Sequence, residues 1–262
     1  MDRVLDRRRI TGPEDSRPPV FDDEDAPVTW KAGEPRLGRG AQDIRPIFLK
    51  AGLINQANGS SYIETGRTKL ACAVYGPRQA KGTAYHENGR LNVEVKFAPF
   101  SCAVRRAPLR DAEDRTVSEL IHQSLISAVR VELFPKAVID IFVTIIECDG
   151  LDSAIAAGTI ACSTALANAG IEMYGLVVSC AAMSVKDEIW LDPVEEEAKQ
   201  ATGVVVLACM PALTTVTSVR QVGSMLPNVA FEAMDVCQTR CTDIHQVVAQ
   251  ALLATQPPES ST

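Results

Sequence analysis

Long apolar runs are scarce in this sequence of 262 residues. The longest of them, such as AVIDIFVTII at residues 137–146, stay well below the roughly 18 residues that a membrane-spanning helix needs, and they fit a buried strand better. We therefore expect a soluble protein that does not enter a membrane.

Paired cysteines of the CxxC kind and an N-terminal apolar signal segment are missing as well. The eight cysteines stand scattered through apolar segments, without the spacing that marks a disulfide framework or a zinc site. This pattern predicts reduced, mostly buried thiols in an intracellular protein.

An excess of positive charge is also missing, because the net charge is −7. A protein that bound nucleic acid with its whole surface would need clustered lysines and arginines. A local basic patch stays compatible with this balance. The chain is 46% hydrophobic, which is enough for one large domain or two small ones with a substantial core.

The organisation changes near residue 45. Residues 1–44 are rich in Asp, Arg, Pro and Gly without apolar periodicity, so we predict an N-terminal extension that is flexible or laid across a partner. Residues 45–256 carry the patterned segments of a folded domain, and residues 257–262 form a polar tail.

The first half of the domain reads as strands followed by a helix. SSYIETG and TKLACAVYGP predict a hairpin that turns at TGRT, and RLNVEVKFAPF alternates like a strand. RTVSELIHQSLISAV carries a helical apolar stripe, and VIDIFVTIIECDG predicts a strand that ends at a turn.

The next helix, SAIAAGTIACSTALANAG, should begin with Asp152 or Ser153 as its N-cap and end at Gly170. Fourteen of these 18 residues are Ala, Gly, Ser, Thr or Cys, so the helix can approach a sheet closely and we place it in the middle of the fold. Strands follow again at residues 174–193 and 203–223, before a long helix at about residues 228–254. Runs of strands followed by helices predict the α+β class.

The segment LDPVEEEAKQATG at residues 191–203 concentrates four carboxylates. In an extended segment Glu195 and Glu197 would face opposite to Glu196, and in a helix only Glu195 and Glu196 would share the face of Asp192. Three adjacent glutamates therefore cannot all serve one metal ion or one proton. We interpret the segment as a solvated acidic turn.

An ordered set of segments resembles the RNase PH family. These segments are GLINQANGSSYIETGRTKLACAVYGPR, FAPFS, VELFPKAVIDIFVTIIECDG and STALANAGIEMYGLV, and the likeness runs from about Arg45 to Ala254. Members of this family degrade RNA from its 3′ end by phosphorolysis or build the ring of the RNA exosome. The opening RRRITGPEDSRPP makes the eukaryotic exosome branch the nearest match. The resemblance implies an RNase PH-like domain of ribosomal protein S5 domain 2-like β-α units, assembled into a ring.

The resemblance also implies where catalytic groups should stand. Active members carry two aspartates six residues apart, the first after the leucine of an LD strand end, and then a third acid. Here the first is Asp192, while Ala198 and Val204 occupy the other two positions, so we expect a vestigial site without catalytic residues. Glu197 would substitute for Ala198 only if the backbone shifted its register.

The phosphate-holding loop that the family places before the helix after PFS also looks altered. A count without gaps puts residues 111–114, with the sequence DAED, where phosphate should bind, and these carboxylates would repel it. A shift by one to three residues would bring Arg110 or Arg115 into that role.

Four arginines are the candidates for RNA contact in the pore of such a ring: Arg78, Arg105, Arg106 and Arg110. Contact there would be with phosphates and independent of sequence. The alternative is that they pair with acidic neighbours or a partner subunit.

We expect no metal and no cofactor. Cys237, Cys241 and His245 recur at intervals of four, but the ends of that triple lie about 12 Å apart at 1.5 Å per residue, too far for one ion. His86 and His122 have no defensible nucleophile beside them.

The resemblance implies a non-catalytic subunit that structures the exosome core and its RNA channel during 3′-to-5′ RNA processing and degradation. Its expected partners are other RNase PH-like subunits in a heterohexameric ring, cap subunits with S1 or KH domains, a separate catalytic nuclease and the threaded RNA. The expected location is the nucleus, nucleolus and cytoplasm. The alternative is an active phosphorolytic 3′-to-5′ exoribonuclease of the RNase PH type.

Overall fold

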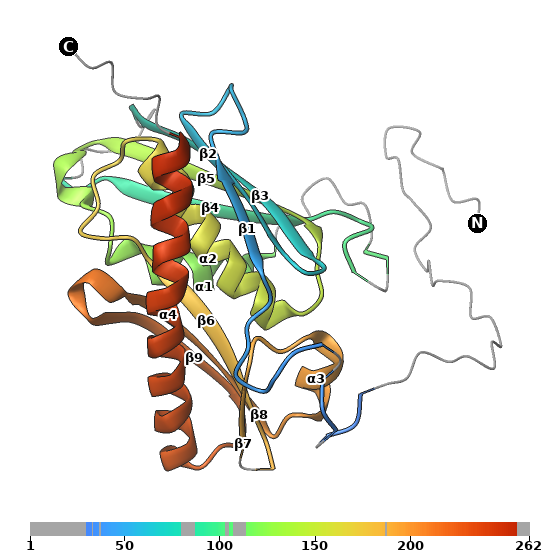
Figure 1. Cartoon of the computed structure of the whole chain (residues 1–262). Coiled ribbons are helices and arrows are strands. Elements are labelled where there is room, and N and C mark those ends of the chain that lie inside the picture. Colours follow the sequence, from blue (N-terminus) through green and yellow to red (C-terminus); the bar gives the residue numbers. More distant parts are fainter. Residues whose placement is uncertain are drawn as a thin grey trace, which may run out of the picture.

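The computed structural model of the chain describes residues 30–255 except residues 33, 37, 80–86, 103–104, 107–113 and 187. This part forms two sheets with helices between and beside them (Figure 1). The first sheet has the order β1-β2-β3-β5-β4 and the second the order β7-β6-β8-β9. The chain is α+β, as predicted.

The first sheet is built largely from neighbours in sequence. Its strands are β1 (Ile47–Ala51), β2 (Gly59–Thr65), β3 (Thr68–Gln79), β4 (Arg90–Phe97) and β5 (Ala137–Glu147). The predicted β2–β3 hairpin is confirmed, and its turn contains Gly66 with a φ of 57°, a conformation that glycine adopts without strain. Helix α1 (Arg115–Ile126) carries the chain from β4 to β5, which pair in parallel.

Helix α2 (Leu151–Asn168) lies between the two sheets and contacts both, as its small residues predicted. A Cβ on Gly59 of β2 would lie 2.3 Å from the carbonyl oxygen of Ala165, so the absence of a side chain lets strand and helix approach. The predicted N-cap was wrong, because α2 begins at Leu151 after Gly150. The side chains of Asp152 and Ser153 instead bind arginines, Arg220 and Arg45 respectively.

The second sheet and a long helix complete the domain. The remaining elements are β6 (Val178–Val185), β7 (Glu188–Leu191), α3 (Glu195–Gln200), β8 (Gly203–Met210), β9 (Thr215–Gly223) and α4 (Pro227–Thr255), with 3₁₀ turns at Val131–Leu133 and Pro211–Leu213. Helix α4 packs on β6 and β8 and extends along the molecule to β1 (Figure 1). No described helix combines the length and the apolar character that crossing a bilayer requires.

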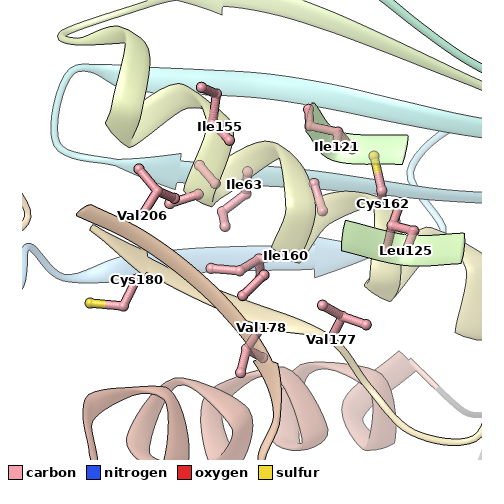
Figure 2. Close-up of a cluster of buried hydrophobic side chains, with 14 of the residues drawn as sticks. Ile63, Ile121, Leu125, Ile155, Ile160, Cys162, Val177, Val178, Cys180 and Val206 are labelled. Atoms are coloured by element: carbon pink, nitrogen blue, oxygen red, sulfur yellow. The ribbon is translucent and has the colours of Figure 1, made fainter. Parts of the chain in front are cut away.

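The core runs without interruption from one sheet through α2 to the other. Figure 2 shows Ile63 of β2, Leu125 of α1, Ile160 of α2 and Val178 of β6 among its side chains. All eight cysteines are free thiols and six of them are buried, which confirms the reading of the cysteines as mostly buried thiols.

The predicted N-terminal extension differs from the structure in its last part. The backbone N–H of Ala32 donates to Oε1 of Gln200 at 2.8 Å, and the N–H of Leu191 donates to the carbonyl of Ala41 at 2.8 Å. Residues 30–44, apart from the undescribed 33 and 37, thus belong to the folded domain. Apolar periodicity did not signal this segment because polar and backbone contacts supply much of its attachment. Residues 1–29 and the tail at 257–262 lie outside the described residues.

Candidate functional site

The site predicted from the LD strand end lies where β7 leaves the second sheet. Asp192 follows β7 with a φ of 51°, and its N–H donates to the carbonyl of Ala181 at 2.8 Å. Helix α3 begins three residues later. Asp192 is thereby fixed between the second sheet and the described part of residues 30–45, which we call the N-terminal segment.

The guanidinium of Arg45 binds the Asp192 carboxylate in a bidentate manner. Nε donates to Oδ2 at 2.7 Å and Nη2 donates to Oδ1 at 2.6 Å, while the Arg45 backbone N–H adds a bond of 3.0 Å to Oδ2. Nη1 of Arg45 also lies 3.2 Å from Oδ2 of Asp149, two residues after the end of β5. Such a bidentate pair is the strongest common arrangement of these two groups.

The two aspartates around Arg45 differ in pKa. Burial alone would raise the pKa of Asp192, but the hydrogen bonds and charge of Arg45 outweigh it, so this pKa lies below its ordinary value. Burial raises the pKa of Asp149, and the charges of Arg45 and Arg67 only partly oppose that effect. Asp192 is therefore held as a carboxylate and is a poor proton donor near neutral pH.

Glu197 is the second carboxylate held by arginines. It is buried, and its Oε2 accepts from Nη2 of Arg36 at 2.9 Å and from Nη2 of Arg39 at 3.2 Å. Arg39 also donates through Nη1 to Oδ2 of Asp192 at 3.3 Å, so one guanidinium joins both acids.

The interpretation of the acidic segment as a solvated turn was therefore wrong for Glu197. Glu195 and Glu196 are exposed, and Glu195 forms an ion pair of 2.7 Å with Lys199 one turn later on α3. Glu197 points inward because Arg36 and Arg39 bind its carboxylate, and both arginines lie outside the acidic sequence segment.

Ala198 and Val204 stand in an apolar environment. Val204 is buried with Met183 and Trp190 in a small cluster against which Ala198 and Trp30 pack. The rings of Trp30 and Trp190 meet edge to face with centroids 5.4 Å apart. An acid at position 204 would lose its hydration without gaining a partner within this cluster.

The arginines proposed for RNA contact fall into three groups. Arg78 is exposed and pairs with Asp140, and Arg106 lies 3.7 Å above the ring of Phe97 and 3.6 Å from Asp114. Arg105 is exposed. Arg110 lies outside the described residues, as does most of the loop at 111–114 that was compared with a phosphate site.

The described residues contain no cluster of three or more His, Cys, Asp or Glu side chains suited to a metal ion. Cys237 and Cys241 are buried against the second sheet, which agrees with a packing role. His86 lies outside the described residues.

Sequence reasoning missed Arg36, Arg39 and Arg45. Their spacing in PRLGRGAQDIRP was visible, but only the fold brings them to the acids about 150 residues away. They also line a cleft of 1210 Å³ between the N-terminal segment and α4, where Arg240 and Asp243 pair with each other at 3.1 Å.

The fold matches solved structures of exosome proteins. Rice (Oryza sativa) Rrp46 superposes with a TM-score of 0.70 at 20% identity, covering 82% of this chain and 98% of that one. An Archaeoglobus fulgidus exosome structure with RNA bound to the active site gives a TM-score of 0.68 at 17% identity, covering 80% and 91%.

The sequence comparisons define the family. Residues 43–172, from β1 through α2, match the model of the 3′ exoribonuclease family, domain 1 (RNase PH). The exosome complex component mtr3 of Schizosaccharomyces pombe is 34% identical over 95% of this chain and 96% of its own length, and MTR3 of Homo sapiens is 35% identical over 95% and 94%. The chain belongs to the RNase PH family, and its relatives include MTR3- and Rrp41-like exosome components.

Proposed function

We propose that this chain is a non-catalytic subunit of an RNA exosome core. In this role it completes a heterohexameric ring of RNase PH-like subunits and helps to form the channel that leads RNA to a separate nuclease. Relatives that span nearly its whole length are exosome complex components, which supports this assignment. Cap subunits with S1 or KH domains would then sit on the ring, in the nucleus, nucleolus and cytoplasm.

The observation that carries the proposal is the state of the acids after β7. Phosphorolysis would use carboxylates here either to hold a cation or to deliver a proton. Asp192 and Glu197 do neither as they stand, since Arg45, Arg39 and Arg36 occupy their oxygens. Releasing them would leave buried arginines without a partner, which is costly.

Positions 198 and 204 support the same conclusion, because neither of them carries an acid. Their side chains contribute to packing around Trp190 instead of supplying charge. Of the three glutamates only Glu195 and Glu196 face solvent, and Glu195 already pairs with Lys199. An exposed ion pair is weak and leaves its carboxylate accessible, so Glu195 and Glu196 are the acids of α3 on which residual catalysis would have to depend.

RNA contact is proposed for Arg105, which is exposed, and to a smaller degree for Arg78 and Arg106. Asp140 and Asp114 partly neutralise the latter two, so their attraction for phosphate is reduced. Contact would be through phosphates and independent of base sequence.

The test measures nucleoside diphosphate release from a 3′-labelled RNA in the presence of inorganic phosphate. The assembled complex is prepared with the unchanged chain and with the double variant Glu195→Gln and Glu196→Gln, so activity from a neighbouring subunit is common to both. We expect the two complexes to release nucleoside diphosphates at equal rates. A rate that falls tenfold or more in the double variant would establish catalysis by this chain and overturn the proposal.

A further inference from the structure

The eight cysteines all lie among the described residues, and they divide into two kinds. Six are buried, among them Cys162 and Cys180, which Figure 2 shows within the core. The other two, Cys102 and Cys148, are partly exposed to solvent. Because an oxidant in solution needs access to the sulfur, these two are the thiols of the chain that can react.

The two partly exposed cysteines are neighbours in space. Strands β4 and β5 pair in parallel, and their pairing continues past both ends, because the backbone N–H of Cys148 donates to the carbonyl of Ser101 at 2.8 Å. Adjacent strands lie about 4.8 Å apart, and the Cα atoms of a disulfide lie about 4.4 to 6.8 Å apart. Since Ser101 immediately precedes Cys102, the backbone places the two cysteines at a spacing that a disulfide can bridge.

A pair of core thiols shows why proximity alone is not enough. The sulfurs of Cys72 on β3 and Cys162 on α2 lie 3.7 Å apart, but both side chains are fully buried. The hydrogen bond that Cys72 donates to Cys162, together with burial, raises the pKa of Cys72 well above its ordinary value. Without access and without a thiolate, this pair stays reduced and serves as an internal control.

The surroundings of Cys102 and Cys148 indicate which thiol reacts first. Burial raises the pKa of the Cys148 thiol to about 11, although the positive charge of Arg106 opposes this effect. Cys148 is therefore protonated near neutral pH, and its S–H donates to the carbonyl of Gly150 at 3.4 Å. A protonated thiol is a poor nucleophile, so an attack on an external disulfide begins at Cys102.

We propose that Cys102 and Cys148 form a reversible dithiol–disulfide site, which is oxidised by a low-molecular-weight disulfide such as oxidised glutathione. Two observations carry it together: of the eight cysteines these two are the accessible ones, and the backbone brings them side by side. The site is a property of the chain itself and does not depend on the proposed function.

The oxidation takes place in two exchanges. The Cys102 thiol loses its proton to solvent and attacks one sulfur of oxidised glutathione, which forms a mixed disulfide and releases one glutathione thiolate that takes up a proton. Cys148 then loses its proton and attacks the Cys102 sulfur, which releases the second glutathione in the same way. Two protein thiols become one disulfide, and one glutathione disulfide becomes two thiols. The second exchange is intramolecular, which compensates for the small thiolate fraction of Cys148.

The disulfide would join two segments beside the acid–arginine site. Cys102 shortly precedes Arg105 and Arg106, and Cys148 immediately precedes Asp149, which pairs with Arg45. Helix α2 begins just after these residues. Oxidation would therefore restrain the chain that carries Arg105 and Arg106 against the start of α2.

The experiment incubates the reduced full chain with oxidised glutathione at neutral pH and follows its oxidation by intact mass spectrometry. Disulfide-linked peptides are then mapped to identify the bonded cysteines. The unchanged chain is compared with the variants Cys102→Ser and Cys148→Ser. Cys72→Ser, which removes one thiol of the buried pair, is the matched control.

We expect the unchanged chain and Cys72→Ser to form the bond between Cys102 and Cys148 about tenfold faster than any other linkage, because reactivity follows access. Cys148→Ser should stop at one glutathione on Cys102, and Cys102→Ser should react about tenfold more slowly with oxidised glutathione. An excess of reduced glutathione should restore both thiols. A mixed disulfide that persists on Cys102 of the unchanged chain, or faster bonding among the buried thiols, overturns the inference. Peptide mapping of the unchanged chain decides between these outcomes even where a variant fails to fold.

Discussion

Replacing Glu197 by glutamine should destabilise the chain far more than the same replacement of its neighbour Glu196. The two residues are adjacent in α3, but the Glu197 side chain is 6% exposed beside an Arg36 side chain that is 2% exposed. Glutamine keeps the shape of the Glu197 side chain and removes its charge. Arg36 would then remain buried without its carboxylate, and Arg39 would keep only Asp192.

The size of the effect follows from the burial of this pair. Removing one partner of a buried ion pair typically costs about 3 to 5 kcal/mol, and we expect about 3 kcal/mol because glutamine can still accept hydrogen bonds from the arginines. For a chain of this size that corresponds to a fall in Tm of roughly 6 to 12 °C. Glu196→Gln should change stability by less than about 0.5 kcal/mol, as exposed substitutions usually do.

Urea unfolding at pH 7, followed by tryptophan fluorescence, measures both variants. The only tryptophans, Trp30 and Trp190, lie in contact with each other at this site, and Arg36 lies 4.9 Å above the Trp190 ring. Equal midpoints for Glu197→Gln and Glu196→Gln would refute the reasoning, because the arginines would then not depend on Glu197.

Three further changes probe the fold around the site. Because the pKa of Asp192 is lowered in the folded chain, Asp192 favours folding above about pH 4 and loses that contribution as pH falls through its folded pKa. In urea unfolding at a series of pH values, the Asp192→Asn variant should therefore be less stable than the unchanged chain at pH 7 but lose less stability on acidification. A difference in unfolding free energy between the two chains that stays constant with pH would contradict this. Gly59→Ala should lower the unfolding free energy by more than about 2 kcal/mol, since its Cβ would meet the backbone of α2 at 2.3 Å. Gly175→Ala is the control and should cost less than about 1 kcal/mol, because the atom nearest to its Cβ would lie 3.7 Å away. Val204→Asp should cost about 3 kcal/mol or more in thermal unfolding, and an equal effect of Asp at its exposed cross-strand partner Val222 would show that burial is not the cause.

The helices and strands of this fold could be predicted from the sequence because the patterns that specify them are local. The turn glycine between β2 and β3, the apolar stripe of α1 and the small residues of α2 each reflect a rule that acts within one segment. The long final helix was predicted within one residue at each end. The N-cap of α2 was missed because Asp152 and Ser153 bind arginines that are distant in sequence.

The site was harder to predict from the sequence, because it too depends on contacts between residues that are distant in the chain. The acidic segment drew attention to Asp192, but the inward orientation of Glu197 depends on Arg36 and Arg39. These arginines lie in a segment without apolar periodicity, so it looked like a separate extension. Contacts between distant charges follow from the packed fold and leave no periodic pattern in the chain.

The measurement that tests the central claim most directly is the native mass and subunit composition of the complex that this protein occupies when it is purified gently from its own cells. The account predicts one copy of this chain in a ring of different RNase PH-like subunits, together with S1- or KH-type caps. A homohexamer of this chain would contradict it, and would identify the exposed acids of α3 as the first place to look for catalysis.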